Sequence, residues 1–148
     1  MKHLLLIIAV ITFTSTINAQ DSERILGTWL TQDGDSKVTI EKNGDGTYDG
    51  TIVWLKEPHR ENGEEKKDDK NPDNNLQSRP IMGLKLLQGF SYDEDDEEWI
   101  DGTIYDPKSG STYKCLMWFD DDPETLLVKG YIGLSIIGKK VVWKKASL

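Results

Sequence analysis

Oxygen-bearing side chains recur in one short segment at a spacing that could hold a cation. In the run Asp69-Lys70-Asn71-Pro72-Asp73-Asn74-Asn75 they stand at the first, third, fifth and seventh positions, as in the first half of a calcium-binding loop. The second half fails, because Asn74 stands at the glycine position and Pro80 at the glutamate position of that pattern. We therefore expect a loop whose polar side chains bond their own backbone, and no metal site. A cation site of another geometry on the same oxygens is the alternative.

Nucleophiles and general bases are scarce once the first nineteen residues are set aside. The chain then holds one histidine, His59, which stands among charged residues, and one cysteine, Cys115, which alternates with apolar residues as a small core residue does. No nucleophile elbow accompanies them. We expect no catalytic residue and no cofactor. A hydrolase built on two of the many carboxylates is the remaining enzymatic alternative.

The charge balance argues against further classes of function. The 148 residues include 26 acidic and 18 basic side chains, for a formal net charge of −8 at pH 7. That balance repels phosphate backbones, so we expect no nucleic-acid partner, and it disfavours an anionic membrane surface. Acidic residues cluster at positions 93–98 and 120–124. We expect solvated hairpin tips there, with a weak divalent-cation patch as the alternative.

The first nineteen residues have the pattern of a targeting signal. Lys2 precedes an apolar run over residues 4–13, and the small residue Ala19 ends the segment. The run is too short to cross a bilayer, which takes about twenty apolar residues. We therefore predict a signal peptide over residues 1–19, a single mature domain over residues 20–148, and a periplasmic or secreted protein without a membrane span.

From residue 36 onward, apolar residues alternate with polar ones and turn residues recur every eight to twelve positions, a pattern typical of antiparallel all-β domains. Runs such as Asn43-Gly44-Asp45-Gly46 supply the positive φ angles of hairpins. We predict a small up-and-down β-barrel of about eight strands. The strands are expected over residues 28–32, 37–42, 47–56, 84–92, 99–106, 111–120, 125–132 and 139–145.

Alternate residues of these strands should face the barrel interior. Gly50, Gly102 and Gly130 fall in the same phase, where a missing side chain marks a bend and would leave interior space. The sequence does not decide between a filled interior and one that holds a ligand. The predicted core face comprises Val38, Ile40, Tyr48, Ile52, Trp54, Leu84, Leu86, Phe90, Ile100, Ile104, Tyr113, Met117, Phe119, Leu126, Val128 and Ile132. The candidate wall residues of a ligand cavity are Tyr48, Ile52, Trp54, Phe90, Ile104, Met117, Phe119 and Trp143.

Two other regions each allow two interpretations. The apolar residues of the outer face are covered either by the long loop and the segment before Gly27, or by a partner, with a homo-oligomer near Trp118 as one form of the latter. The apolar connection over residues 133–138 either guards a hydrophobic mouth or turns inward and plugs the barrel. The outer apolar residues are Val53, Leu55, Leu87, Tyr105, Leu116, Trp118, Leu127 and Tyr131.

Several segments resemble known families. Gly27-Thr28-Trp29 resembles the Gly-x-Trp signature of lipocalins and other calycins, in which the tryptophan packs at the closed end of the barrel. Four further segments resemble the bacterial domain of unknown function 2147 family, and the likeness covers nearly all of the mature chain. It implies an exported lipocalin-like barrel and brings no established activity, cofactor or ligand. The matching segments are Asp69-Lys70-Asn71-Pro72-Asp73, Arg79-Pro80-Ile81-Met82-Gly83-Leu84, Gly102-Thr103-Ile104-Tyr105-Asp106-Pro107, and Gly130-Tyr131-Ile132-Gly133 ahead of Gly138 and Trp143.

Arg79 has two expected roles in a barrel of this kind. By analogy with lipocalins it could stack over Trp29 and close the barrel, and its functional alternative is a counter-ion for an acidic ligand head group. Gln77 stands where the resemblance leads us to expect a second basic residue, which weakens a two-arginine anion site. Taken together, the sequence favours an exported calycin-like barrel that binds a small apolar or amphipathic molecule, with Arg79 beside the wall residues. The alternative is a filled barrel that acts as a protein-interaction or envelope structural module.

Overall fold

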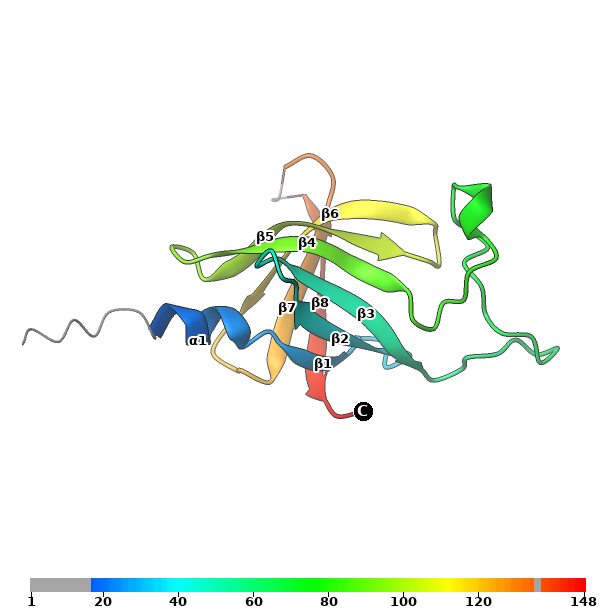
Figure 1. Cartoon of the computed structure of the whole chain (residues 1–148), viewed down its shortest axis with the longest axis horizontal. Coiled ribbons are helices and arrows are strands. Elements are labelled where there is room, and N and C mark those ends of the chain that lie inside the picture. The colour runs from blue at the N-terminus through cyan, green and yellow to red at the C-terminus, as the bar shows by residue number, and fades with distance from the viewer. Residues whose placement is uncertain (1–16, 135–136) are drawn as a thin grey trace, which may run out of the picture.

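Eight antiparallel strands close into one barrel in the order of the sequence (Figure 1). This computed structural model describes residues 17–134 and 137–148, so most of the predicted signal peptide lies outside the described residues. β8 pairs with β1 and completes the ring, which confirms the predicted all-β up-and-down barrel. The elements are α1 (Ile17–Glu23), β1 (Gly27–Leu30), β2 (Ser36–Lys42), β3 (Tyr48–Leu55), the 3-10 helix η1 (Asn74–Leu76), β4 (Lys85–Asp93), β5 (Glu98–Asp106), β6 (Ser111–Phe119), β7 (Thr125–Tyr131) and β8 (Gly138–Ala146).

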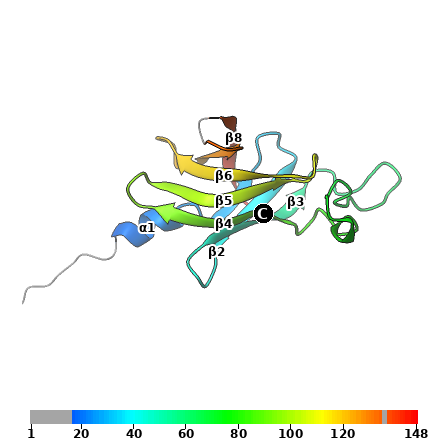
Figure 2. The same cartoon turned by 90° about the horizontal axis from the view of Figure 1, so that it is seen from above.

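The up-and-down order places alternate connections at opposite ends of the barrel. α1 and the β2–β3, β4–β5 and β6–β7 turns lie at one end, which we call the closed end. The β1–β2, β3–β4, β5–β6 and β7–β8 connections lie at the other end, which we call the mouth. Figure 2 shows the long β3–β4 connection, residues 56–84, extending beyond the barrel on the side away from α1.

Aromatic side chains fill the closed half of the barrel. The Phe119 ring centroid lies 5.7 Å from that of Trp99 and 5.6 Å from that of Trp29. Trp29 is fully buried, and its Nε1 donates to the carbonyl oxygen of Ile25 at 2.9 Å. The guanidinium of Arg24 lies 4.8 Å from the centroid of Phe119. The segment ahead of β1 therefore covers the closed end, and not the outer face as one interpretation of the sequence had it.

A β-bulge in β5 reverses the predicted side-chain phase at the start of that strand. The register between β5 and β6 shifts between Trp99 and Gly102, and Asp101 takes a φ of 63°. One extra residue therefore separates the two parts of the ladder. As a result Trp99 is fully buried, whereas Ile100, which alternation assigned to the core, is only partly buried.

Similar register shifts correct the predicted faces of β3 and β4. The shift at Lys37/Val38 pairs Trp54 with Lys37, so Trp54 leaves the core face and is 37% exposed. Leu87 was expected outside but is fully buried, because the β3–β4 register shifts on both sides of Gly50. Ile132, the last predicted core residue, follows the end of β7 and is exposed.

The three inward glycines differ in what they face. A Cβ on Gly102 would lie 2.4 Å from the Phe90 ring, and one on Gly50 would lie 2.8 Å from Cδ1 of Leu87. These two glycines make room for neighbouring side chains, so the expectation that they leave interior space is wrong. A Cβ on Gly130 would meet nothing closer than Cγ2 of Ile104 at 3.4 Å, an ordinary contact, and Gly130 borders a cavity.

The apolar residues around Trp118 on the outer face shield one another. Trp118 and Val142 flank Leu127 in register across three strands. Leu127 is buried, and Trp118 and Val142 are partly buried. Cross-strand neighbours are thus sufficient to cover Leu127. A homo-oligomer near Trp118 stays a prediction.

Candidate functional site

The mouth half of the barrel holds a cavity of about 1180 Å³. Its apolar walls include Ile52 of β3, Leu86 of β4, Ile104 of β5, Val128 of β7 and Trp143 of β8. The volume is at or above the upper end of the range usual for small-molecule pockets, about 300–1,000 Å³. The barrel is therefore filled at the closed end and hollow at the mouth.

The mouth is bordered by all four connections at that end. The long β3–β4 connection contributes most of the charged border, including Lys56, Arg60 and Lys67. The β7–β8 connection contributes Ile132 and Ile137 in its described part. An apolar interior thus opens through a border that is largely charged but apolar on one side.

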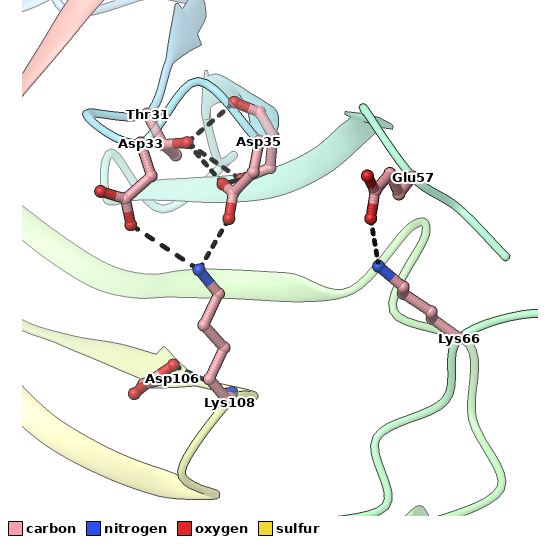
Figure 3. Close-up of polar contacts among 8 residues, drawn as sticks. Thr31, Asp33, Asp35, Glu57, Lys66, Asp106 and Lys108 are labelled. Carbon is pink, nitrogen blue, oxygen red and sulfur yellow. Dashed lines mark hydrogen bonds and ion pairs between the residues drawn. The ribbon is translucent and has the colours of Figure 1, made fainter. Parts of the chain in front are cut away.

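An ion-pair strap crosses the mouth. Lys108 Nζ, from the β5–β6 connection, lies 2.7 Å from Asp35 Oδ2 and 3.7 Å from Asp33 Oδ2, both from the β1–β2 connection (Figure 3). In a ring of eight strands these two connections are four strands apart, so they face each other across the opening. The hydroxyl groups of Thr31 and Ser36 also donate to Asp35, at 3.0 and 3.1 Å.

Titration of the strap follows from these contacts. Burial raises the pKa of the Asp35 carboxyl, but hydrogen bonds from Lys108, Thr31 and Ser36 outweigh it, so the pKa is lowered overall. The hydrogen bond to Asp35 raises the pKa of Lys108, against the opposing effect of burial. Both groups are therefore charged at neutral pH, and the strap is an ion pair there.

Three cavity-lining lysines carry no ion pair. Among the described residues, Lys56, Lys67 and Lys139 have no carboxylate within salt-bridge distance and no side-chain hydrogen bond. Their neighbours differ: Lys66 pairs with Glu57 at 3.7 Å (Figure 3), and Arg60 pairs with Asp69. The border thus offers cationic groups that the protein's own acids leave available.

The structure divides the sequence-predicted site residues among three places. Ile52, Ile104 and Trp143 line the cavity. Trp54 lies on the outer surface, with Lys37 Nζ 5.2 Å from its ring centroid, and Arg79 lies outside the barrel. The residues that contribute to the packed core instead of lining the cavity are Tyr48, Phe90, Met117 and Phe119.

Arg79 fastens the long loop to the outside of β5. Its Nε donates to Oδ2 of the fully buried Asp68 at 2.8 Å, and its guanidinium lies 5.6 Å from the centroid of the Tyr105 ring. Tyr105 donates from its hydroxyl to Oδ1 of Asp68 at 2.5 Å, and Asn71 donates from Nδ2 to Oδ2 at 2.8 Å. We call these four residues the loop clasp. The loop therefore covers Tyr105, one of the apolar outer-face residues.

The expected stacking of Arg79 on Trp29 is wrong. Lys145 occupies that position: its Nζ lies 4.4 Å from the Trp29 ring centroid and donates to the carbonyl oxygen of Leu26 at 2.7 Å. The loop clasp holds Arg79 on the outside of the barrel. The spacing of the sequence does not distinguish Arg79 from Lys145, because only the folded chain brings each of them to its aromatic partner.

The oxygen-rich segment forms turns, as expected. Asn71 Oδ1 accepts from the backbone N–H of Asp73 at 2.8 Å, and Asp73 Oδ1 accepts from that of Asn75 at 2.9 Å. Within residues 17–134 and 137–148, no three His, Cys, Asp or Glu side chains gather as a metal site would require. The side chains of Asn71 and Asp73 therefore bond the local backbone, while Asn71 also contributes to the loop clasp and Asp69 pairs with Arg60.

The two candidate nucleophilic or basic residues lie apart from the cavity lining. Cys115 is fully buried, and burial raises the pKa of its thiol to about 12. A thiol of that pKa carries almost no thiolate at neutral pH. His59 is exposed on the long loop, where it forms an isolated bridge with Glu65.

An up-and-down barrel with a Gly-x-Trp first strand, one filled end and one hollow end defines a lipocalin-like protein. A solved structure supports this fold assignment: the lipocalin-family protein HP1028 from Helicobacter pylori superposes with a TM-score of 0.69 at 22% sequence identity, covering 83% of each chain. The chain belongs to the family of uncharacterized proteins conserved in bacteria, DUF2147, whose family model matches residues 27–145. A search of curated proteins found no significant match.

Proposed function

We propose that this chain is an exported, non-enzymatic barrel that holds a small amphipathic molecule with an acidic head group in its mouth cavity. The observation that carries the proposal is the pairing of apolar walls with the three lysines Lys56, Lys67 and Lys139, which have no ion pair among the described residues. The apolar part of the ligand would pack against wall residues such as Leu86 and Val128.

The two parts of such a ligand would be held by different contacts. Burying a hydrocarbon chain contributes about 0.8 kcal/mol per CH₂ group, and the wall side chains supply the apolar surface for it. An acidic head group at the border could pair with lysines that form no other ion pair, so no existing interaction has to be broken. The acids Asp33 and Asp35 would not repel it strongly, because Lys108 already neutralises them in part.

Export is supported by the pattern of residues 1–19. No helix in the part of the chain that the structure describes is long and apolar enough to cross a membrane. Cleavage after Ala19 would retain Arg24 and Ile25, whose contacts cover the closed end. A processed chain that begins at Gln20 would therefore keep that cover.

Native mass spectrometry tests whether a ligand accompanies the protein. The sample is the chain recovered after export by an expressing bacterium, measured before and after extraction with organic solvent. The expected result is a mass that begins at Gln20, with an adduct of a few hundred daltons that extraction removes. An unchanged bare mass, together with failure to bind the probe described next, would contradict the proposal.

A dansyl-labelled undecanoic acid tests the head-group assignment. Lys56→Gln, Lys67→Gln and Lys139→Gln should each weaken its binding by about two- to fivefold, because each removes one exposed cation. The corresponding dansyl alcohol should bind more weakly than the acid to the wild type and be insensitive to these changes. Lys114→Gln, at an exposed position on β6 outside the cavity lining, is the matched control. Equal binding of acid and alcohol would overturn the head-group assignment.

A further inference from the structure

The β7–β8 connection presents an apolar tip to solvent. Ile132, Leu134 and Ile137 are 74%, 68% and 67% exposed. The backbone N–H of Ile137 donates to the carbonyl oxygen of Leu134 at 3.0 Å, which holds these two residues close together. We call these three residues the apolar tip. Side chains of this kind at such exposure are typical of surfaces that enter a less polar medium.

The apolar tip is continuous with the cavity. Ile132 and Ile137 line the cavity at the mouth as well as facing solvent. An apolar surface therefore runs from outside the barrel past these side chains to the interior walls. These three side chains are exposed and do not turn inward, so they do not plug the barrel as one interpretation of the sequence had it.

Charge is distributed unevenly between the two ends of the barrel. Every charged residue in the β2–β3, β4–β5 and β6–β7 turns at the closed end is acidic. Beside the apolar tip the chain continues into the exposed pair Lys139 and Lys140. The acidic turns thus lie at the end away from the tip. The repulsion from anionic membranes that the overall net charge of −8 predicts therefore acts mainly on the closed end and would orient the molecule with its mouth toward a negative surface.

We propose that the mouth docks on a lipid bilayer with anionic headgroups, with the apolar tip in the interface and Lys139 and Lys140 at the phosphates. Interfacial binding of this type combines buried apolar area with attraction of basic residues to anionic lipid. This goes beyond the proposed function, since docking requires no bound ligand. It would give an amphipathic ligand an apolar path from the bilayer into the cavity.

A bilayer fits the apolar tip better than a second copy of the chain does. Three side chains on one connection supply far less than the roughly 800 Å² per partner that a stable protein interface buries. A bilayer needs no complementary surface, because hydrocarbon surrounds whatever enters it. Self-association is therefore an outcome that the experiment must separate from docking.

Site-specific labelling reads the surroundings of the tip directly. Leu134→Cys is labelled with an environment-sensitive fluorophore, and the native Cys115, being fully buried, leaves the introduced thiol as the reactive one. Asp121→Cys, in the acidic β6–β7 turn at the closed end, is the matched control. The vesicles are phosphatidylcholine alone and phosphatidylcholine mixed with phosphatidylglycerol in equal parts, each with and without a spin-labelled lipid.

Docking predicts a blue shift and spin-label quenching at position 134 on the mixed vesicles, and neither at position 121. In the Lys139→Gln, Lys140→Gln double variant the affinity for mixed vesicles should fall by about tenfold or more, since each basic residue near an anionic surface contributes about 1 kcal/mol. Changes at both positions, at position 121 alone or at neither would overturn the proposal, as would equal affinity for both vesicle types. So would a shift at position 134 that grows with protein concentration in the absence of vesicles.

The two proposals fail separately. Gly130→Leu should obstruct the cavity without altering the apolar tip, so this variant should dock on mixed vesicles and lose the dansyl fatty acid. Leu134→Ser, at the tip residue outside the cavity lining, should weaken docking while the dissolved probe still binds. If the tip variant docks as the wild type does, the docking proposal falls and the cavity proposal stands.

Discussion

At the scale of single residues, the most constrained group outside the core is the carboxylate of Asp68. It is fully buried, which would be unfavourable for a charge without partners. Its oxygens accept from Tyr105, Arg79 and Asn71, so donors from three parts of the chain satisfy it. Because Lys67 directly precedes Asp68, the loop clasp also fixes where one of the mouth lysines leaves the loop.

Tyr105→Phe tests the loop clasp. The change removes one donor from a buried carboxylate, and we expect it to lower the free energy of unfolding by about 1–3 kcal/mol. Burial, together with the hydrogen bond to Asp68 and its charge, raises the pKa of Tyr105 to about 12. Since the folded pKa lies above the unfolded value, this group's contribution is complete below pH 10 and is lost as the pH rises toward about 12.

Urea unfolding from neutral to alkaline pH measures both effects. The wild type should lose stability between pH 10 and about 12, and Tyr105→Phe should lose less over the same interval. Tyr131→Phe, at a partly buried position of β7, is a suitable control for general alkaline effects. If Tyr105→Phe and the wild type have the same free energy of unfolding at neutral pH, the Tyr105 hydroxyl does not stabilise the Asp68 carboxylate.

At the scale of elements, the strap between the β1–β2 and β5–β6 connections spans the opening of the cavity, and we expect it to limit access. Lys108 and Asp35 connect opposite sides of the mouth. A ligand that enters the cavity must either break this ion pair or move past it. Both side chains are substantially exposed, so the ion pair contributes only about 0.5 kcal/mol to stability. Its main effect should therefore be on exchange rates.

Lys108→Gln should speed the release of the dansyl fatty acid several-fold, with an effect of about 0.5 kcal/mol on stability. Because the folded pKa of Asp35 is lowered, its contribution is complete above the unfolded value near 4 and is lost as the pH falls through the lower folded value. Because the pKa of Lys108 is raised, its contribution is lost only as the pH rises above 10.5, the ordinary pKa of a lysine.

Stopped-flow release of the probe as a function of pH checks this prediction. Wild-type release should be constant through neutral pH and accelerate only as the pH falls below the ordinary carboxyl value of 3.8 and through the lowered folded pKa of Asp35. Lys108→Gln should release quickly throughout and show a weaker acid response. Lys114→Gln, which leaves the strap intact, should follow the wild type. Equal rates in wild type and Lys108→Gln would show that the strap does not limit access.

Strand positions were predictable because alternation and turn chemistry are local. All eight expected strands are present, with ends within about two residues of those observed. The faces were less predictable wherever a bulge inserts a residue, as between Trp99 and Gly102, because a bulge leaves the composition of the strand unchanged. The loop clasp was not predictable, because Asp68 and Tyr105 are 37 residues apart and meet only in the fold.

The candidate site was partly predictable, because alternation along a strand also indicates which residues face the interior. Alternation placed Ile52 and Ile104 on the inward face of their strands, where the structure has them line the cavity, and Trp143 was named only as a candidate wall residue. Alternation alone could not separate them from Met117 or Phe119, which have the same phase but lie in the packed half. Lys56 and Lys67 come from the β3–β4 connection and Lys139 comes from β8, and no spacing in the sequence brings them together.

At the scale of the whole molecule, the barrel is asymmetric along its axis. Aromatic packing and acidic turns occupy the closed end, while the cavity, the available lysines and the apolar tip occupy the mouth. A cavity reduces stability, because its walls lack the contacts that side chains of a filled core would make. If the cavity serves binding, filling it should improve stability at the expense of function.

A pair of glycine substitutions tests this trade-off. Gly130→Leu places a side chain in the cavity, so it should raise the free energy of unfolding by about 1 kcal/mol and abolish binding of the dansyl fatty acid. Gly102→Leu makes the same change in the packed half, where a Cβ would lie 2.4 Å from the Phe90 ring. It should destabilise the barrel by about 3 kcal/mol or more through overpacking.

Urea unfolding and probe titration of both variants test this prediction. The two variants can be compared directly, because both changes replace an inward glycine with leucine. Opposite signs of the stability change would show that the molecule keeps one end filled and leaves the other empty. Lys129→Leu, next to Gly130 on β7 but in the outward phase, controls for the gain of an apolar strand residue. If Gly130→Leu is as destabilising as Gly102→Leu, or binds the probe as the wild type does, the mouth half is not a ligand cavity.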